Sequence, residues 1–268
     1  MGKDKKSAAA GGSAVAATGG YAVRVADKIK AELDAAAQKR LVQEVQVGLI
    51  YTAVQIDTGA LGVAYTFPEA RTCGGTGVPL KGRTVAELVD RLGGKSLLAS
   101  AVALAAVNAL LADAPLPPDT CEADVLDNLD LHRGDRVCMV GCFAPLLKPL
   151  KDLGVELKTF DQVPKPGSRP AEEVKEHLPG SEVAIITATS LINNTLDHLL
   201  ELASPCREVA LLGSSTPLLP RAFAGTPVTS LAGIRVEEPE GVLRCIAEGQ
   251  GFCVFKRYVR KLSLRLDG

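Results

Sequence analysis

Two junctions that follow apolar runs hold residues suited to binding a ligand. Gly141 and Phe143 come after the first apolar run in the second half of the chain, and Asp161 comes after the next run. A glycine at such a point lets a ligand approach the free amides of a following helix. Rossmann proteins often place an acid about twenty residues further on, against a ribose hydroxyl. The pair predicts a nucleotide-like ligand; the structural alternative is a tight turn at Gly141 and a loop capped by Asp161.

The full G-x-G-x-x-G fingerprint of dinucleotide sites is absent around Gly141. Phe143 and Pro145 occupy places where glycines would let a pyrophosphate approach the backbone. A compact ligand is therefore favoured over a dinucleotide, and a ligand that resembles S-adenosylmethionine stays open. These residues do not identify a particular cofactor.

Two later junctions, residues 187–195 and 213–216, are rich in hydroxyl and amide groups. The candidate binding residues in them are Thr189, Asn193, Gly213, Ser215 and Thr216. Free amides and hydroxyls at the start of a helix bind carboxylate or phosphate, because the helix dipole favours negative charge there. N-capping by Asn194, Ser215 or Thr216 is the structural alternative. Capping would account for one polar residue at each helix start, but each of these junctions holds a cluster of them. We therefore predict a ligand site here.

In the first half of the chain, Asn108 is the candidate site residue, because it is a polar residue on an apolar helix face. At helical spacing it shares a face with Leu97, Ala101, Leu104 and Leu111. A buried amide must find hydrogen-bond partners. Asn108 therefore either locks a neighbouring loop or projects into a cleft between domains, where it would contact a ligand.

The sequence favours neither a preformed metal site nor nucleophilic catalysis. Cys138 and Cys142 lie four residues apart, with the first inside an apolar run, and the three histidines are isolated. A G-x-S-x-G motif is absent. The formal net charge of -1 offers no attraction for DNA, and aromatic residues are scarce. We expect the partner to be a small molecule, a class to which metal chelates belong, and not a nucleic acid. Whether the chain forms a homo-oligomer stays open.

Short apolar runs alternate with helical segments from residue 135 onwards. The runs are Val137 to Val140, Val155 to Phe160, Val183 to Ile186, Val209 to Leu212, Val228 to Leu231 and Phe252 to Phe255. The helical segments between them start near Phe143, Glu172, Thr195, Leu218 and Glu240. Continuously apolar strands that alternate with helices form a parallel sheet covered on both faces, and right-handed crossovers make it doubly wound. Ligands bind outside the carboxyl ends of such strands, where the candidate residues of this half lie.

The first half predicts a smaller α+β unit. Apolar residues at steps of three and four predict a helix over residues 21–38. Residues that alternate with a period of two predict strands over residues 45–51 and 61–67, with turn chemistry at residues 57–59. We expect these two strands to form an antiparallel hairpin.

Helix-start signals follow the hairpin. Thr84 and Glu87 have the spacing of a capping box. Ser96 is placed to cap a long alanine-rich helix that ends before Pro115. The apolar stretch in that helix is short, alanine-rich and flanked by charges, so we expect a buried helix and no membrane association.

Length and composition favour two domains of ordinary size. Residues 1–20, rich in Ala, Gly and Ser, are expected to be a disordered tail. Residues 21–118 would form the smaller α+β domain and residues 119–268 the Rossmann-like domain. Seven scattered cysteines are typical of reduced thiols, which predicts a cytoplasmic protein.

Several motifs in order along the chain resemble those of the putative heavy-metal chelation family. They are GVAYT at 62–66, AAVNA at 105–109, MVGCFAPL at 139–146, TATSLINNTLD at 187–197, LLGSSTPL at 211–218 and EGQG at 248–251. The chain departs from the family at Ser214, where proline is expected, and at Asn194, where glycine is usual. The resemblance implies an enolase N-terminal-like domain, a Rossmann-like domain and a shared cleft. It also implies a role with pterin-, flavin- or siderophore-like molecules that chelate metals.

The leading hypothesis is an enzyme of metallophore or pterin-like metabolism. Asp161 would be a hydrogen-bond acceptor or a weak general base, Asn193 and Thr189 would orient the ligand, and Ser215 and Thr216 would hold an anionic group. Because no residue is an evident strong nucleophile, condensation, hydrolysis by activated water or binding alone is favoured. The alternatives are a binder that sequesters a metal chelate and a methyltransferase-like enzyme that uses S-adenosylmethionine.

Overall fold

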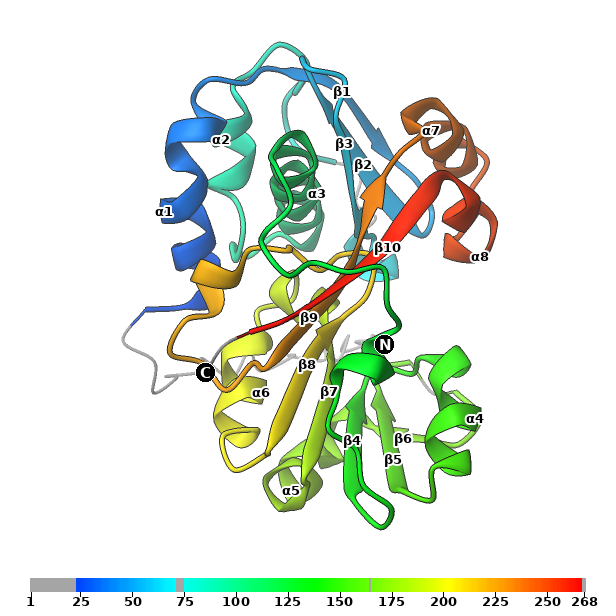
Figure 1. The fold of residues 1–268 in the computed structure, drawn as a ribbon. Coiled ribbons are helices and arrows are strands. Elements are labelled where there is room, and N and C mark those ends of the chain that lie inside the picture. Colours follow the sequence, from blue (N-terminus) through cyan, green and yellow to red (C-terminus); the bar gives the residue numbers. More distant parts are fainter. Residues whose placement is uncertain (1–22, 71–74, 164, 267–268) are drawn as a thin grey trace, which may run out of the picture.

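The computed structural model describes residues 23–70, 75–163 and 165–266 and contains two β-sheets (Figure 1). One is a three-stranded antiparallel sheet with the order β1-β2-β3. The other has seven strands in the order β10-β9-β8-β7-β4-β5-β6 and is mostly parallel. The expected fold class, a doubly wound Rossmann-like sheet preceded by a smaller α+β unit, is confirmed.

The small sheet corrects the predicted hairpin. Its strands are β1 (Val42–Val47), β2 (Tyr51–Ile56) and β3 (Leu61–Tyr65). The alternating run predicted as one strand over residues 45–51 is divided by a turn, so three strands stand where two were expected. At this turn a Cβ on Gly48 would lie 2.7 Å from Ile246, so a larger residue does not fit without a shift. Alternation marks which residues share a face, but it does not mark where the chain folds back.

The helical side of the small unit follows the helix-start signals. Its elements are α1 (Val25–Ala37), η1 (Pro68–Ala70), α2 (Val85–Val89) and α3 (Leu97–Asp113). The capping box of Thr84 and Glu87 is confirmed, and the Ser96 hydroxyl accepts a hydrogen bond from the first turn of α3 at 3.3 Å. A Cβ on Gly62 of β3 would come within 2.1 Å of the backbone of α3. The small residues of α3 and this glycine therefore let helix and sheet pack at very short range.

The large sheet occupies the second half of the chain. Its strands are β4 (Arg136–Val140), β5 (Glu156–Asp161), β6 (Ser168–Pro170), β7 (Val183–Thr187), β8 (Glu208–Leu212), β9 (Ser230–Val236) and β10 (Val259–Arg265). Its helices are α4 (Ala144–Asp152), α5 (Val174–His177), α6 (Leu196–Leu202), α7 (Pro239–Ala247) and α8 (Phe252–Phe255). Short 3-10 turns are η2 (Val125–Asn128), η3 (Ala171–Glu173), η4 (Leu178–Gly180), η5 (Ala188–Leu191), η6 (Pro220–Phe223) and η7 (Lys256–Tyr258). The strand order reverses between β4 and β7, which makes their carboxyl ends the switch point where such folds bind ligands.

Three elements of the large sheet differ from the prediction. Residues 252–255, predicted as the last strand, form helix α8, and the last strand is β10, which runs antiparallel to β9. The helix expected from Leu218 is reduced to the turn η6, where Pro220 limits helix formation. The short strand β6 was not predicted. A run of four apolar residues does not distinguish a strand from a buried helical turn, which explains the error at α8.

The two sheets are joined by elements that cross the predicted boundary at residue 118. Helices α7 and α8 follow β9 along the chain but lie beside the small sheet (Figure 1). Val242, Ile246 and Phe255 pack in one cluster with Leu61 and Val63 of β3. The small sheet is therefore covered by α3 on one face and by α7 and α8 on the other. The domain boundary stays a prediction, and the packing shows that both halves of the chain build the small sheet's core.

Among the described residues, no helix has the length and apolar character needed to cross a membrane. The apolar stretch that the sequence places near residue 97 is helix α3, most of which is buried. The predicted tail, residues 1–20, lies outside the described residues.

Candidate functional site

The loop after β4 begins with a tight turn at the switch point. Gly141 has a φ of 90°, and its N–H donates to the carbonyl of Phe160 at 2.7 Å. A Cβ at this position would lie 2.9 Å from the Cβ of Thr187. Only glycine suits both this φ and this approach to β7, so Gly141 does make the tight turn that the sequence left as an alternative. The turn directs Cys142 and Phe143 across the carboxyl edge of the sheet.

Asp161, at the end of β5, anchors the same loop. Its Oδ2 accepts from the N–H of Cys142 at 3.0 Å and from Nζ of Lys165 at 2.7 Å, and its Oδ1 accepts from the N–H of Val163 at 3.1 Å. Burial raises the pKa of this carboxyl, but the hydrogen bonds to Lys165 and the two amides outweigh burial and hold the pKa below its ordinary value. Asp161 is therefore ionised at neutral pH and already has three donors.

The loop after β8 meets the loop after β4. Gly213 has a φ of 128°, and a Cβ on it would lie 3.8 Å from Cε1 of Phe143. The Phe143 ring therefore rests beside the Gly213 backbone, although β7 separates their two strands in the sheet. Phe143 is only half-buried, so part of its ring forms an apolar surface at the sheet edge.

Thr189 and Asn193 lie in the segment after β7. The Thr189 hydroxyl is 3.0 Å from that of Thr187, the residue against which Gly141 turns. The Asn193 Oδ1 accepts from the N–H and the hydroxyl of Thr195 at 3.3 and 2.8 Å. The amide nitrogen of Asn193 has no partner among the described residues, so it is a donor that a ligand could use.

The backbone conformation of Asn194 accounts for one departure from the family motif, the asparagine where glycine is usual. Its φ is 61°, the left-handed conformation that glycine adopts at no cost and that asparagine tolerates better than other residues. Its side chain donates to the carbonyl of Gly94 in the loop before α3 at 3.1 Å. The motif's glycine is therefore replaced by a residue that keeps the turn and adds a contact with the small unit.

Asn108 and Ser215 form the joint between β3 and the loop after β8. The amide nitrogen of Asn108 donates to the carbonyl of Val63 at 2.9 Å and to that of Ser215 at 3.2 Å. The Ser215 hydroxyl accepts from the N–H of Tyr65 at 2.9 Å. Asn108 therefore locks a loop, one of the two roles expected for it, and Ser215 bonds across the units instead of capping a helix. We call this cluster of Asn108, Ser215 and the β3 backbone the joint.

Thr216 borders a cavity beside the joint. The cavity has a volume of about 410 Å³ and is lined from α1, the end of α3, residues 114–118, residues 216–221 and β9. Thr216 is 2% exposed, and its hydroxyl has no hydrogen-bond partner among the described residues. Asn108 also lines this space, which we call the groove.

The sequence did not single out an aromatic cluster that adjoins Ser214. The Tyr51 ring makes edge-to-face contacts with Tyr65 and Phe255, with centroids 6.1 and 5.0 Å apart. Burial raises the pKa of the Tyr51 phenol; a hydrogen bond with Ser214 opposes this rise, and the nearby Tyr65 and Cys253 add to it. In the sequence, Tyr51 and Tyr65 look like ordinary positions of an alternating strand. Only the fold shows that they adjoin the loop after β8.

The predicted residues thus divide into two groups. One group lies along the carboxyl edge and is connected by the contacts above; its members are Gly141, Phe143, Asp161, Thr189 and Gly213. We call this group the edge site. The second group, Asn108, Ser215 and Thr216, lies at the joint and the groove. Asn193 contacts its own turn, and no hydrogen bond among the described residues joins it to Asp161 or Ser215.

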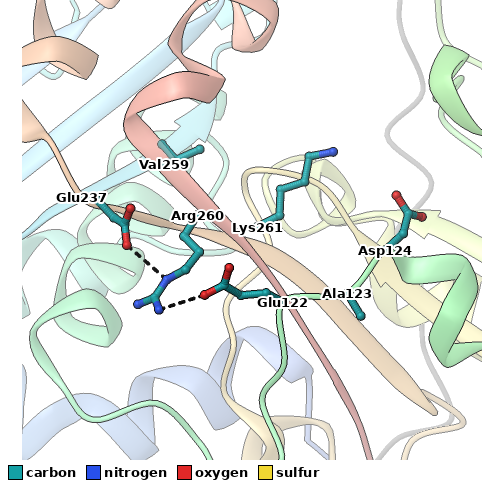
Figure 2. A pocket seen from close by; sticks show the side chains of 7 residues that line it. All are labelled: Glu122, Ala123, Asp124, Glu237, Val259, Arg260 and Lys261. Carbon is teal, nitrogen blue, oxygen red and sulfur yellow. Dashed lines mark hydrogen bonds and ion pairs between the residues drawn. The ribbon is translucent and has the colours of Figure 1, made fainter.

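A second, open cavity of about 560 Å³ lies between the linker after α3 and strand β10. Arg260 occupies its centre and pairs with Glu122 and Glu237, both at 3.1 Å, as Figure 2 shows. None of the candidate residues lines it. These ion pairs are on the surface and connect the linker after α3 to the end of β9, which is a structural role.

The thiols and possible metal ligands of the chain do not form a reactive or metal-binding cluster among the described residues. Within the described part of the chain, no group of three or more His, Cys, Asp or Glu side chains is placed to hold a metal ion. Burial raises the pKa of Cys138 to about 12 and that of Cys206 to about 11, so both remain protonated thiols at neutral pH. The edge site offers a hydroxyl, backbone amides, a carboxylate and an aromatic ring, which suit an organic ligand.

Comparison with known families covers most of the chain. Residues 124–265 match a family model described as putative heavy-metal chelation, and residues 30–111 match a second model with the same description. An uncharacterized protein of Methanocaldococcus jannaschii is 24% identical over 231 residues, which cover 82% of this chain and 88% of that protein.

Two crystal structures of proteins of unknown function share the fold. One, from Pyrococcus horikoshii, has a TM-score of 0.81 at 24% identity and covers 91% of this chain and 100% of that chain. The other, from Desulfitobacterium hafniense, has a TM-score of 0.76 at 20% identity and covers 90% and 98%. These likenesses establish the fold.

Proposed function

The chain belongs to the putative heavy-metal chelation family, and from that premise we propose that it binds an organic metal-chelating molecule at the edge site. The ligand class is a pterin-, flavin- or siderophore-like compound with a flat ring. The observation that carries the proposal is the Phe143 ring, which is partly buried against the core and lies beside the Gly213 backbone at the switch point. Aromatic rings bind flat heteroaromatic ligands through offset or edge-to-face contacts.

Polar groups around Phe143 would recognise the edge of such a ring. Thr189 supplies a hydroxyl, and Asn193, in the same segment after β7, supplies an amide N–H that no hydrogen bond among the described residues uses. Ser214 lies beside Gly213, and Tyr51 is within hydrogen-bonding reach of Ser214. Pterins and flavins present donors and acceptors along one edge of the ring, and catechol chelators present two adjacent ring oxygens, which these groups complement.

Asp161 acts here as a positioning residue. Its carboxylate holds the Cys142 N–H and so fixes the turn that carries Phe143. Because its pKa is lowered, it is a weak base at neutral pH, and its oxygens are already bonded to protein donors. The same bonds leave Asp161 poorly placed to receive a ribose hydroxyl, which removes the main support for a nucleotide or S-adenosylmethionine ligand.

A turnover reaction, if the bound molecule undergoes one, would be a condensation or a hydrolysis by activated water, since the edge site holds no strongly activated nucleophile. The groups named above bind and orient the ligand, and they exclude part of the surrounding water. The proposal therefore concerns binding first, and the fate of the bound molecule decides between an enzyme and a binder.

Isothermal titration of the full chain with 6-hydroxymethylpterin, flavin mononucleotide and an iron–catecholate chelate tests the proposal. We expect at least one of them to bind, and Phe143→Ala to weaken that ligand about tenfold or more, as loss of an aromatic contact predicts. Leu153→Ala, an exposed position just after α4, is the matched control and should leave affinity unchanged.

Mass analysis of the ligand after incubation then separates the two outcomes. A changed ligand indicates an enzyme, and an unchanged ligand indicates a binder. Binding that Phe143→Ala and Asn193→Ala both leave intact, or no binding of any of the three classes, would contradict the assignment of the edge site.

A further inference from the structure

We infer that the groove beside the joint is a second ligand site, which takes an anion with an apolar body such as a medium-chain carboxylate. Its volume of about 410 Å³ is sufficient for a small organic acid. Its walls are largely apolar; they include Leu33, Leu111, Leu116, Leu218 and Ile234. A polar metabolite without an apolar part would leave these walls without a partner.

The charged residues of the groove favour an anion. The Arg221 side chain is 84% exposed, and its nearest acid, Glu32, is 4.0 Å away. Arg235 donates one N–H to a backbone carbonyl of α3, and no other bond of its guanidinium is formed among the described residues. The Asp113 carboxylate is close enough to Arg235 for their charges to interact, but its ion pair is with Arg40, at 2.8 Å. Two guanidinium groups therefore face one weakly paired acid, which suits a carboxylate.

A buried hydroxyl without a partner is the second, independent observation. Thr216 lines the groove, is 2% exposed, and leaves its hydroxyl unbonded among the described residues. The neighbouring Ser215 hydroxyl, which is equally buried, accepts a backbone N–H. Buried hydroxyls are nearly always hydrogen-bonded, so an unbonded one at the wall of a cavity points to a ligand oxygen as its partner.

The groove is separate from the edge site. Its lining comes from α1, α3, the linker and the segment from Thr216 to β9, and it includes no residue of the loop after β4 or of strands β4 to β7. The inference therefore does not depend on the function proposed for the edge site. A ligand in the groove would contact Asn108 and Thr216, which flank the Ser215 carbonyl at the joint.

Titration of the full chain with hexanoate, 1-hexanol and hexylammonium tests the inference, because the three probes share one apolar body and differ in charge. We expect hexanoate to bind most tightly. Arg221→Gln and Arg235→Gln should each weaken hexanoate by about tenfold, as loss of a charge-assisted hydrogen bond predicts. Arg169→Gln removes an exposed arginine that pairs with Glu173 on the large sheet's far edge, and it should change nothing. Phe143→Ala should also leave hexanoate binding unchanged.

Thr216→Val gives a second readout that does not depend on charge. Valine replaces the hydroxyl with a methyl group of similar shape, so the unliganded protein should melt at a higher temperature while hexanoate binds more weakly. Equal binding of 1-hexanol and hexanoate, an unchanged affinity in both arginine variants, or no binding of hexanoate at millimolar concentration would overturn the inference.

Discussion

The joint and the edge site contain similar polar residues, but the two regions use them differently. At the joint, the amide nitrogen of Asn108 donates to a carbonyl of its own unit, that of Val63, and to the Ser215 carbonyl of the other unit, while the Ser215 hydroxyl accepts from the Tyr65 N–H across the units. At the edge site the Phe143 ring is partly buried, and in the adjoining segment after β7 the Asn193 amide nitrogen has no hydrogen-bond partner among the described residues. A polar group whose bonds the protein already supplies holds the structure, whereas one left open is available to a ligand.

The same comparison separates residues within a single loop. Gly213, Ser215 and Thr216 lie within four consecutive residues, yet each of them lies in a different environment. Gly213 accommodates the Phe143 ring, Ser215 bonds to Tyr65, and Thr216 borders the groove with a hydroxyl that has no hydrogen-bond partner among the described residues. Proximity in sequence therefore says little about which residues share a role.

The comparison predicts that the joint carries more stability than the edge site. Asn108→Leu should lower the free energy of unfolding by about 3 kcal/mol, because it removes two partly buried hydrogen bonds and leaves the carbonyls of Val63 and Ser215 short of a donor. Urea denaturation measures this. Asn193→Ala, whose bonds are local, is the control and should cost less than about 1 kcal/mol. Equal losses in the two variants would remove the distinction.

A smaller effect is expected at the turn that carries the edge site. Gly141→Ala should destabilise the protein by about 2 kcal/mol, since alanine is strained at a φ of 90° and its Cβ would meet Thr187 at 2.9 Å. The same variant should also weaken binding at the edge site. Gly134→Ala, at a φ of 88° with open space around it, provides the control for backbone strain alone. An equal loss in Gly134→Ala would show that the contact with Thr187 contributes nothing.

The role of Asp161 in anchoring the loop after β4 predicts that the stability of the protein depends on pH. Its pKa is lowered in the folded protein, so its stabilising contribution is present above the pKa of an unfolded aspartate, about 3.9, and is lost as the pH falls through the lower folded value. Asp161→Asn should therefore be less stable than the parent chain at pH 7, and this gap should narrow as the pH is lowered below the pKa of an unfolded aspartate. Urea titrations at pH 7 and below that pKa test this, and a gap that stays constant would argue against the anchoring role.

The smallest stability effect is expected for Phe143→Ala. Because the ring is only half-buried, its removal should cost less than about 1.5 kcal/mol, while ligand affinity falls as described above. Phe160→Ala, in a fully buried ring of β5, should cost about 3 to 5 kcal/mol and thereby mark the difference between a core ring and a site ring. A large loss of stability in Phe143→Ala would place this ring in the core instead.

Much of the fold could be predicted because its signals are local. The capping box at Thr84 and Glu87, the cap at Ser96 and the alternation of apolar runs with helices after residue 135 were all confirmed. The errors fell where a short pattern is ambiguous. The turn after β1 interrupts an unbroken alternation, and residues 252–255 fit either a strand or one turn of a buried helix.

The candidate site was only partly predictable. The residues after each parallel strand were recognisable, since the carboxyl ends of such strands lie at one edge of a sheet. Tyr51 gave no signal, because it approaches Ser214 only through the packing of the small sheet and α8 against the large sheet. Asp161 was identified as an acceptor, but the sequence could not show that its donors come from the protein itself.

The sequence by itself determined the two sheets, the edge along which the candidate residues gather, and the need of a buried Asn108 for partners. Only the tertiary structure decided which polar groups are already bonded and which remain open. The reason is separation along the chain: Asn108 bonds to a carbonyl 107 residues away, and the Ser215 hydroxyl bonds to an amide 150 residues away. Local patterns fix secondary structure, but such bonds exist only once both units have packed together.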